Sequence, residues 1–255
     1  MNNKMYIHEQ IDIIGPHRAK YMHHMTANFG PLAWEERKQL CYGVWGVIGS
    51  SRKWPEVINL WEEPGYDGLA HSFRHETSHP GHQNPKLAKW WQEAAQWRSG
   101  GITRRIEPAP WTRTVEELCA DGVKGEGYCH DQIQVQQGRA HEFVEMVRQK
   151  AQPVYNKFGW VLAGAWTTAM SNESEAMFLW AMPTWEQWAE CEKARRIDKG
   201  LISWWSDAYK YTTGVTRFLL VDSPLSPMKI GRQSTRADRD PAWREDGPPQ
   251  LDPPR

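Results

Sequence analysis

The sequence predicts an α+β protein in which two ferredoxin-like units, each with the element order β-α-β-β-α-β, close face to face into one barrel. Three observations support this fold class: an internal repeat, apolar alternation typical of strands, and helix start and stop signals between the strands. The repeat begins at residues 6–13, YIHEQIDI, which match residues 128–135, YCHDQIQV. An extended tail rich in Pro, Arg and Asp follows the second unit.

Shorter matches follow in the same order in both halves. They are Phe29-Gly30 with Phe158-Gly159, Gly43-Val44-Trp45 with Gly164-Ala165-Trp166, Leu60-Trp61 with Leu179-Trp180, Trp90-Trp91 with Trp204-Trp205, and Ile102-Thr103-Arg104 with Val215-Thr216-Arg217. Collinear self-similarity is the signature of a duplicated unit. We therefore predict a first unit at residues 1–106, a linker at 107–124, a second unit at 125–222 and the tail at 223–255.

Each unit is read from alternating strands and from helices bounded by Gly and Pro. The first unit has strands at 5–13, 40–50, 56–62 and 102–106, and helices from Gly15 to 28, at 65–76 and at 85–98. The second has strands at 127–135, 161–170, 175–181 and 215–221, and helices at 139–158 and 184–211. Such a sheet carries its helices on one face, so two sheets that bury their bare faces against each other enclose a pocket.

Composition limits the function classes. The 255 residues contain 31 basic and 31 acidic side chains, so the electrostatic signature of a nucleic-acid binder is missing. No apolar run reaches the roughly 20 residues of a membrane helix. The four cysteines are far apart and no secretory segment is evident, which favours a reduced, cytoplasmic protein. Nucleotide-binding glycine loops and the serine-hydrolase and zinc-protease motifs are absent.

The first strand carries the main candidate site. Tyr6, His8 and Gln10 alternate with apolar residues, and Glu9 interrupts the apolar face. We expect the apolar face to pack on helices and the polar face to look into the barrel, where His8 and its counterpart His130 line a cavity. Imidazole titrates near neutrality and suits acid–base catalysis. The alternative is a polar ladder that holds the two sheets together.

Two further histidine groups lie on predicted helices. His24 shares a helix face with Tyr21, and the alternative for such a residue is a surface or capping role. The run HSFRHETSHPGH spaces His71 and His75 four residues apart, which allows a metal site, a solvent-exposed role, or an anion- or carbonyl-directed pair of Arg74 and His75.

Glu62 and the tryptophans complete the candidates. Glu62 ends a strand whose counterpart ends in Ala181, so this carboxylate is present in only one half. Burial beside Trp61 is expected to raise its pKa and suit it to proton transfer, and a salt bridge to an arginine is the alternative. Sixteen tryptophans exceed what two small cores need, so Trp45, Trp61 and Trp166 are candidates for aromatic cavity walls as well as for core packing.

The stretch GVWGVIGSSRKWPEVINLWE at residues 43–62, with its echo in the second half, resembles the NIPSNAP-like family of the dimeric α+β barrel superfamily. The resemblance covers residues 5 to about 222. It implies the barrel fold, but little about chemistry, because the superfamily includes cofactor-free monooxygenases, isomerases, cyclases and haem enzymes.

The sequence thus leads to three functional hypotheses. The first is a cofactor-independent lyase or isomerase that holds a small hydrophobic molecule in a Trp-lined barrel cavity and contains no metal. Its acid–base groups are His8, His24, Glu62 and His75, and its substrate contacts are Tyr6, Tyr21, Trp45, Trp61, Arg74, Tyr128, His130 and Trp166. The second is a haem-binding dehydratase or oxidoreductase with an axial histidine. The third is a non-catalytic binding or assembly module. A homo-oligomer with tail-mediated contacts is expected, unless the tail is disordered.

Overall fold

The computed structural model describes residues 1–49, 53–170 and 173–241 of the chain. The first half contains β1 (Met5–Ile13), α1 (Arg18–His23), η1 (His24–Phe29), α2 (Gly30–Arg37), β2 (Leu40–Gly49), β3 (Glu56–Glu63), α3 (Gly65–Glu76), α4 (Pro85–Ala94) and β4 (Arg98–Pro108). The second contains β5 (Gly127–Val135), α6 (Ala140–Met146), η2 (Val147–Ala151), α7 (Gln152–Asn156), β6 (Val161–Thr168), β7 (Glu175–Met182), α8 (Trp185–Ala194), α9 (Lys199–Ala208) and β8 (Thr212–Asp222). Both halves show the predicted order of elements.

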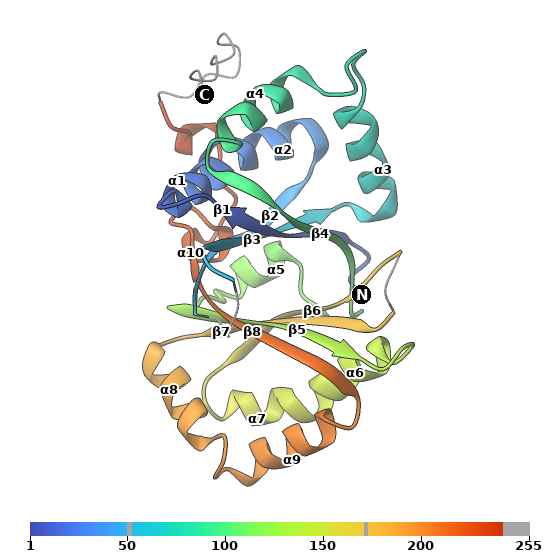
Figure 1. The fold of residues 1–255 in the computed structure, drawn as a ribbon, viewed down its shortest axis with the longest axis vertical. Helices are drawn as coiled ribbons and strands as arrows, with labels where there is room; N and C mark the ends of the chain where they lie inside the picture. Colours follow the sequence, from blue (N-terminus) through green and yellow to red (C-terminus); the bar gives the residue numbers. More distant parts are fainter. Residues whose placement is uncertain (50–52, 171–172, 242–255) are drawn as a thin grey trace.

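The strands form a closed barrel in the order β1-β3-β2-β8-β5-β7-β6-β4. Each half contributes an antiparallel sheet of four strands, and the seams are the β2–β8 and β4–β6 pairs. The helices of the two halves lie outside the barrel on opposite sides (Figure 1). The predicted closure within one chain is therefore confirmed, whereas the origin of the halves by duplication stays a prediction.

The alternation of β1 places its side chains as expected. Tyr6 is fully buried in the cluster that fills the barrel, and His8 is buried at a position paired with Leu60 of β3. Ile11 and Ile13 belong instead to the cluster formed with the helices of the first half. The polar face of the strand thus looks inward.

The repeated Gly-x-Trp motif has a steric origin. A Cβ atom added to Gly43 would lie 2.1 Å from the Trp45 ring, and one added to Gly164 would lie 2.1 Å from the Trp166 ring. Each indole therefore lies across the glycine two residues before it on the same strand face. This arrangement lets a large ring lie flat inside the barrel.

The barrel interior is filled by side chains, which corrects the predicted ligand-sized cavity. Five of the large aromatic residues that fill it are 0–1% exposed: Tyr6, Tyr42, Trp45, Tyr128 and Trp166. The helices α5 (Val115–Ala120) and α10 (Pro227–Ile230) add apolar side chains and contact each other. The void that remains beside His8 and His130 is about 10 Å³, the size of one water molecule.

Two predicted irregular segments are ordered. The linker at 107–124 contains α5, which begins with a capping box of Thr114 and Glu117. The tail packs on its own chain: the Gln233 side chain accepts from the Cys41 N–H and donates to the Cys41 carbonyl. After η3 (Arg236–Asp238), the described tail ends at residue 241. Residues 223–241 thus pack on their own chain, contacts of the tail with a neighbouring subunit stay a prediction, and residues 242–255 lie outside the described part.

Within the described ranges, every helix is too short or too polar to cross a membrane.

Candidate sheet–helix site

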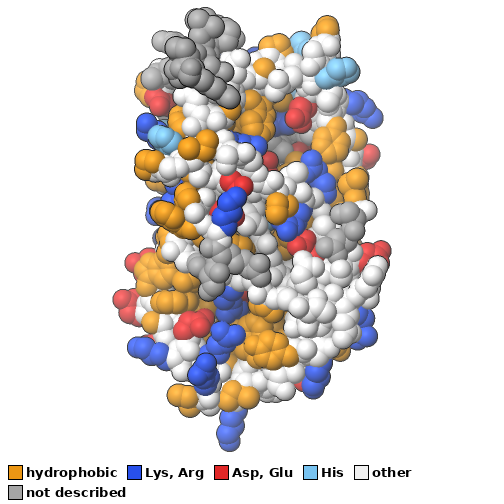
Figure 2. Space-filling view, in the orientation of Figure 1, with side chains coloured by type: hydrophobic (Ala, Val, Ile, Leu, Met, Phe, Trp, Pro, Cys, Tyr) orange, Lys and Arg blue, Asp and Glu red, His pale blue; other side chains and the backbone are white. Residues whose placement is uncertain are grey.

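A pocket of about 290 Å³ lies in the first half, between the outer face of β1 and β4 and the helices α3 and α4. Figure 2 shows it as a hollow in the first half, with hydrophobic and basic side chains around it. A larger depression beside the end of α8 is lined by only six residues, mostly charged ones, and is open to solvent. The pocket between sheet and helices is the better candidate, because ligand sites are concave and mainly apolar with a few placed polar groups.

Glu9 supplies a carboxylate to the floor of this pocket. Its Oε2 accepts from Trp61 Nε1 at 3.0 Å and from Asn59 Nδ2 at 3.1 Å. No hydrogen bond reaches Oε1 from the residues that the structure describes. Two donors thus fix the orientation of the carboxylate and leave one oxygen available to a ligand. Sequence reasoning noted that Glu9 interrupts an apolar strand face but assigned it no role, and that interruption was the signal.

The walls of the pocket are aromatic. Phe29 packs edge-on against Trp61 at 4.9 Å and tilted against Trp90 at 4.6 Å, and Trp90 packs against Trp91 at 5.2 Å. All four side chains line the pocket. Trp61, which was predicted to line a cavity inside the barrel, lines this pocket outside it instead.

Three arginines also line the pocket, each above an aromatic ring. Arg37 lies over Phe29 at 5.4 Å, Arg98 over Trp91 at 4.1 Å and Arg105 over Phe73 at 5.3 Å. Their cation–π contacts cover ring faces at the edges of the pocket and bring positive charge close to the space that a ligand would occupy.

The equivalent space in the second half is closed by an ion pair. There Asp131 takes the place of Glu9, and Arg217 donates to it from Nε at 2.7 Å and from Nη2 at 2.9 Å. The guanidinium also lies over the rings of Tyr155, Trp160 and Trp205. The void that remains around this pair is about 10 Å³.

Strand register explains the difference between the halves. Glu9 is paired with Thr103 on β4, whereas Asp131 is paired with Arg217 on β8. The sequence match of Arg104 with Arg217 was therefore wrong by one residue. Because side chains alternate, Arg104 points to the other face of its strand, where its Nε donates to Glu175 at 2.9 Å.

His8 and His130 meet inside the barrel, with their Nε2 atoms 3.0 Å apart. His130 Nδ1 lies 3.0 Å from the Phe178 carbonyl, which only accepts, so His130 Nε2 is the acceptor and His8 Nε2 donates to it. His8 Nδ1 is buried without a partner in the described structure. Burial lowers the pKa of His8 well below its usual value and that of His130 to about 4. The pair is a neutral link between the two sheets, as the ladder alternative supposes.

Glu62 and Tyr6 lie at the barrel end closed by α5. Glu62 Oε2 accepts from the Tyr6 hydroxyl at 3.0 Å and from the Val115 N–H at 2.9 Å. Burial raises the pKa of Glu62, as expected. Tyr128 occupies the corresponding position in the second half and accepts from the Gly125 N–H. The bond between Val115 and Glu62 connects α5 to the barrel.

His24 is held between helix and ring. It stacks on Trp90 at 5.1 Å, Asn28 donates to its Nδ1 at 3.0 Å, and its Nε2 donates to the Trp90 carbonyl at 3.2 Å. Burial lowers its pKa to about 4. Tyr21, close by, is fully buried and its hydroxyl accepts from Asn59 at 3.0 Å. The nitrogens of His24 are therefore occupied by structural contacts.

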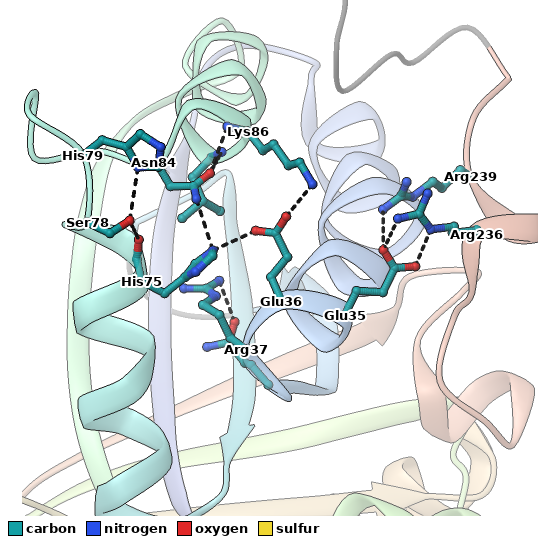
Figure 3. A network of polar contacts seen from close by, with 12 residues as sticks. Glu35, Glu36, Arg37, His75, Ser78, His79, Asn84, Lys86, Arg236 and Arg239 are labelled. Carbon is teal, nitrogen blue, oxygen red and sulfur yellow. Dashed lines mark hydrogen bonds and ion pairs between the residues drawn. The ribbon is translucent and has the colours of Figure 1, made fainter.

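His75 belongs to a polar network on the surface of the helices (Figure 3). Its Nε2 lies 2.7 Å from Glu36, which also accepts from Lys86 at 2.7 Å. Arg74 is exposed on α3 and does not line the pocket. Among the described residues, no group of three or more His, Cys, Asp or Glu side chains is placed to hold a metal ion. The four predicted acid–base residues thus lie at separate places and form no common site.

The haem alternative requires an axial ligand and enough space for a porphyrin. Haem iron takes an axial imidazole, thiolate, phenolate or thioether ligand. Among these, the pocket lining offers only the thioether of Met25. The barrel void is bordered by two imidazoles but holds only about 10 Å³, far less than a porphyrin needs. Neither the sheet–helix pocket nor the barrel void fits haem.

Comparison with solved structures places the fold. A candidate monooxygenase from Fusobacterium nucleatum subsp. nucleatum superposes with a TM-score of 0.56 at 9% identity, over 86% of this chain and 92% of that one. Another candidate monooxygenase, from Lactobacillus acidophilus NCFM, superposes with a TM-score of 0.55 at 8% identity, over 92% of this chain and 97% of that one. The chain has the dimeric α+β barrel fold. Identities this low show the fold alone.

The finer family and cofactor predictions gain no such support. A NIPSNAP domain protein from Burkholderia xenovorans matches only 37% of this chain and 92% of its own, with a TM-score of 0.33 at 16% identity. A haem-binding protein from Thermus thermophilus gives 0.44 at 13% identity, over 88% and 94%, which is too low to carry an argument. No protein-family model and no curated protein matches the sequence.

Proposed function

We propose that this protein is an enzyme that binds a small, mainly apolar molecule in the sheet–helix pocket of its first half and transfers a proton through Glu9. The proposal keeps the cofactor-independent lyase or isomerase chemistry expected from the sequence and moves it from the barrel to the pocket. The proposal assigns no catalytic role to the four residues predicted as acid–base groups, which make structural contacts instead: His8, His24, Glu62 and His75. The cytoplasmic location, the homo-oligomeric state and the NIPSNAP branch remain predictions.

In the proposed step, Oε1 of Glu9 takes a proton from an acidic C–H group next to a carbonyl. The C–H bond breaks and its electron pair stays on the substrate as an enolate. Where the substrate has a C=C bond β,γ to the carbonyl, the same carboxyl then returns the proton to the γ-carbon of the dienolate, which moves the double bond into conjugation and completes an isomerisation. In a lyase reaction, the electron pair of the enolate instead forms a C=C bond to the neighbouring carbon, and a leaving group on that carbon departs with the electrons of its own bond. Arg98 supplies positive charge for the enolate oxygen.

The observation that carries the proposal is a difference between two otherwise similar halves. The carboxylate of the second half, Asp131, is paired with Arg217, whereas Glu9 in the first half is paired with Thr103. Glu9 is half-buried beside aromatic rings, where a carboxylate loses part of its hydration and gains from a partner. The second half pairs its carboxylate, and the void around that ion pair is only about 10 Å³. The first half keeps the carboxylate, omits the arginine and opens about 290 Å³. A retained carboxylate without its ion pair is better explained by a ligand than by loose packing.

Proton transfer at carbon can be tested without a known substrate. The protein is incubated in D₂O with a panel of small aromatic and alicyclic carbonyl compounds, and loss of C–H signals is followed by proton NMR. We expect catalysed exchange for a subset of the panel. The Glu9→Gln variant keeps the shape of the pocket and removes the base, so its exchange is expected to fall by about 100-fold or more. Glu142→Gln, which changes an exposed carboxylate, serves as the control.

Two results would contradict the proposal. Equal exchange by the Glu9→Gln variant and the unmodified protein would remove Glu9 from the chemistry. Binding of panel compounds without any exchange would favour the non-catalytic binding module.

A further inference from the structure

We infer that the ligand of this pocket carries a carboxylate or a similar anionic group, bound between Arg37 and Arg105, so that the substrate class is a small aromatic or alicyclic acid. The inference rests on the proposed function for the site and adds the charge of its substrate. It is carried by two guanidinium groups that line the pocket and have no ion pair among the described residues.

Arg37 is a buried cation at the end of α2, with 6% of its surface exposed. Its hydrogen bond goes to a neutral partner, the side-chain oxygen of Gln39, at 3.0 Å. Burial lowers its pKa, and the carboxylates of Glu63 and Glu76 act on it only through space. A buried charge without a direct counterion is costly, so this position favours an anion.

Arg105 brings a second guanidinium to the same end of the pocket. Its Nη1 donates to Thr103 Oγ1 at 3.0 Å, and its Nε is buried with no partner in the described structure. A carboxylate that accepts from an arginine in two places would satisfy such a donor.

Glu63 does not supply the missing negative charge. It lies near both arginines, which act to lower its pKa, but burial outweighs them and raises the pKa to about 7. Its oxygens already accept from Ser72 at 3.0 Å and from Gln39 at 2.7 Å. This carboxyl is therefore only partly ionised near neutrality. The Gln39 side chain lies between it and Arg37, because Gln39 donates to Glu63 and accepts from Arg37.

The register of the sheet gives the spacing of the backbone positions that carry Arg105 and Glu9. Arg105 is paired with Ile7, and Thr103 is paired with Glu9, so the two positions are two residues apart along the same strand face. That spacing is about 6.6 Å along a strand. It suits a molecule whose carboxylate and reactive C–H group are separated by one ring or a short chain.

A cationic ligand at Glu9 is the competing expectation, because Asp131 binds a guanidinium in the second half. The lining residues argue against it. Arg37, Arg98 and Arg105 contribute three positive charges to the pocket, against the two carboxylates of Glu9 and Glu76. A free cation would enter a site that already contains an excess of positive charge.

Three probes with one ring system and different charges test the inference. They are indole-3-acetate, the neutral indole-3-acetamide and the cationic tryptamine, and their binding to the full chain is measured by isothermal titration calorimetry. We expect the acetate to bind about tenfold or more tightly than the acetamide, which corresponds to one charge-assisted contact. Tryptamine should bind most weakly.

Arginine variants distinguish binding of the anionic group from binding of the ring in the pocket. Arg105→Gln and, where it folds, Arg37→Gln should lower affinity for the acetate about tenfold and leave the acetamide unchanged. Arg148→Gln is the matched control, because Arg148 lies over the Trp111 ring outside the pocket. Equal affinity for acetate and acetamide, absence of binding by all three probes, or an unchanged acetate affinity in Arg105→Gln would each overturn the inference. The proposed function is tested independently, by comparing deuterium exchange between the unmodified protein and the Glu9→Gln variant.

Discussion

Single residues show how burial and partners decide what a side chain does. Sequence alternation correctly predicted that His8 and His130 face inward, because a strand has a period of two. It did not predict that the two imidazoles would bond to each other, since that distance depends on how the sheets close. His24 and His75 likewise found partners on other elements, Trp90 and Glu36. Contacts between distant segments leave no pattern in a single sequence.

The buried histidines predict a pH dependence of stability. The pKa values of His24 and His130 are lowered to about 4, and that of His8 is lowered as well. The unfolded chain binds protons at these residues below about pH 6.5, whereas the folded chain binds them only at lower pH. Their contribution to the free energy of unfolding is thus complete above pH 6.5 and is lost as the pH falls towards 4.

Denaturant unfolding between pH 7.5 and 4 measures this effect. The double variant His8→Leu/His130→Leu should show a shallower loss of stability with falling pH than the unmodified protein. His71→Asn alters an exposed histidine and should follow the unmodified curve. Identical slopes for the double variant and the unmodified protein would show that the pair does not titrate as described.

Single elements explain which parts of the fold were predictable. Strands and helices were found in the right order, because periodicity and Gly or Pro signals are local. The capping box of α5 was missed although Thr114 and Glu117 have the required spacing, because the surrounding segment is rich in Pro and charge. The sequence match of residues 102–104 with 215–217 was wrong by one residue, and a shift of one residue reverses the strand face of every side chain.

The Gly-x-Trp motif makes a prediction for β6. Replacing Gly164 by Ala places a methyl group 2.1 Å from the Trp166 ring in a filled barrel. We expect a loss of roughly 1–3 kcal/mol in the free energy of unfolding, the usual cost of overpacking. Gly81→Ala is the control, because nothing lies within 4 Å of its Cβ position, and it should change stability by less than about 0.5 kcal/mol. Equal effects of the two substitutions would argue against the motif's steric role.

Thr103 on β4 occupies the position that Arg217 occupies on β8. An arginine at position 103 is therefore expected to close the pocket. In Thr103→Arg the new side chain should pair with Glu9, as Arg217 pairs with Asp131. Binding of indole-3-acetate should be lost, while the free energy of unfolding should change by only about 1 kcal/mol, because a buried ion pair gains little net stability. Thr103→Ser should bind as the unmodified protein does. Retained binding by Thr103→Arg in calorimetry would place the ligand elsewhere.

At the scale of the whole molecule, the two halves share the same order of elements and differ in how the space beside their sheets is filled. The repeat in the sequence was sufficient to predict a closed barrel in one chain. It was not sufficient to predict whether the barrel is hollow, because that depends on how Trp45, Trp166 and the tyrosines fit together in three dimensions. The helices α5 and α10 add to this filling from segments expected to be irregular. Space for a ligand is left between sheet and helices instead.

The most direct test of the central claim is a crystal structure with 4-bromobenzoate, located by the anomalous signal of bromine. We expect one bromine peak between β1, β4 and the helices α3 and α4, with the carboxylate against Arg37 and Arg105. A bromine peak inside the barrel beside His8 and His130, or in the second half beside Arg217, would contradict it.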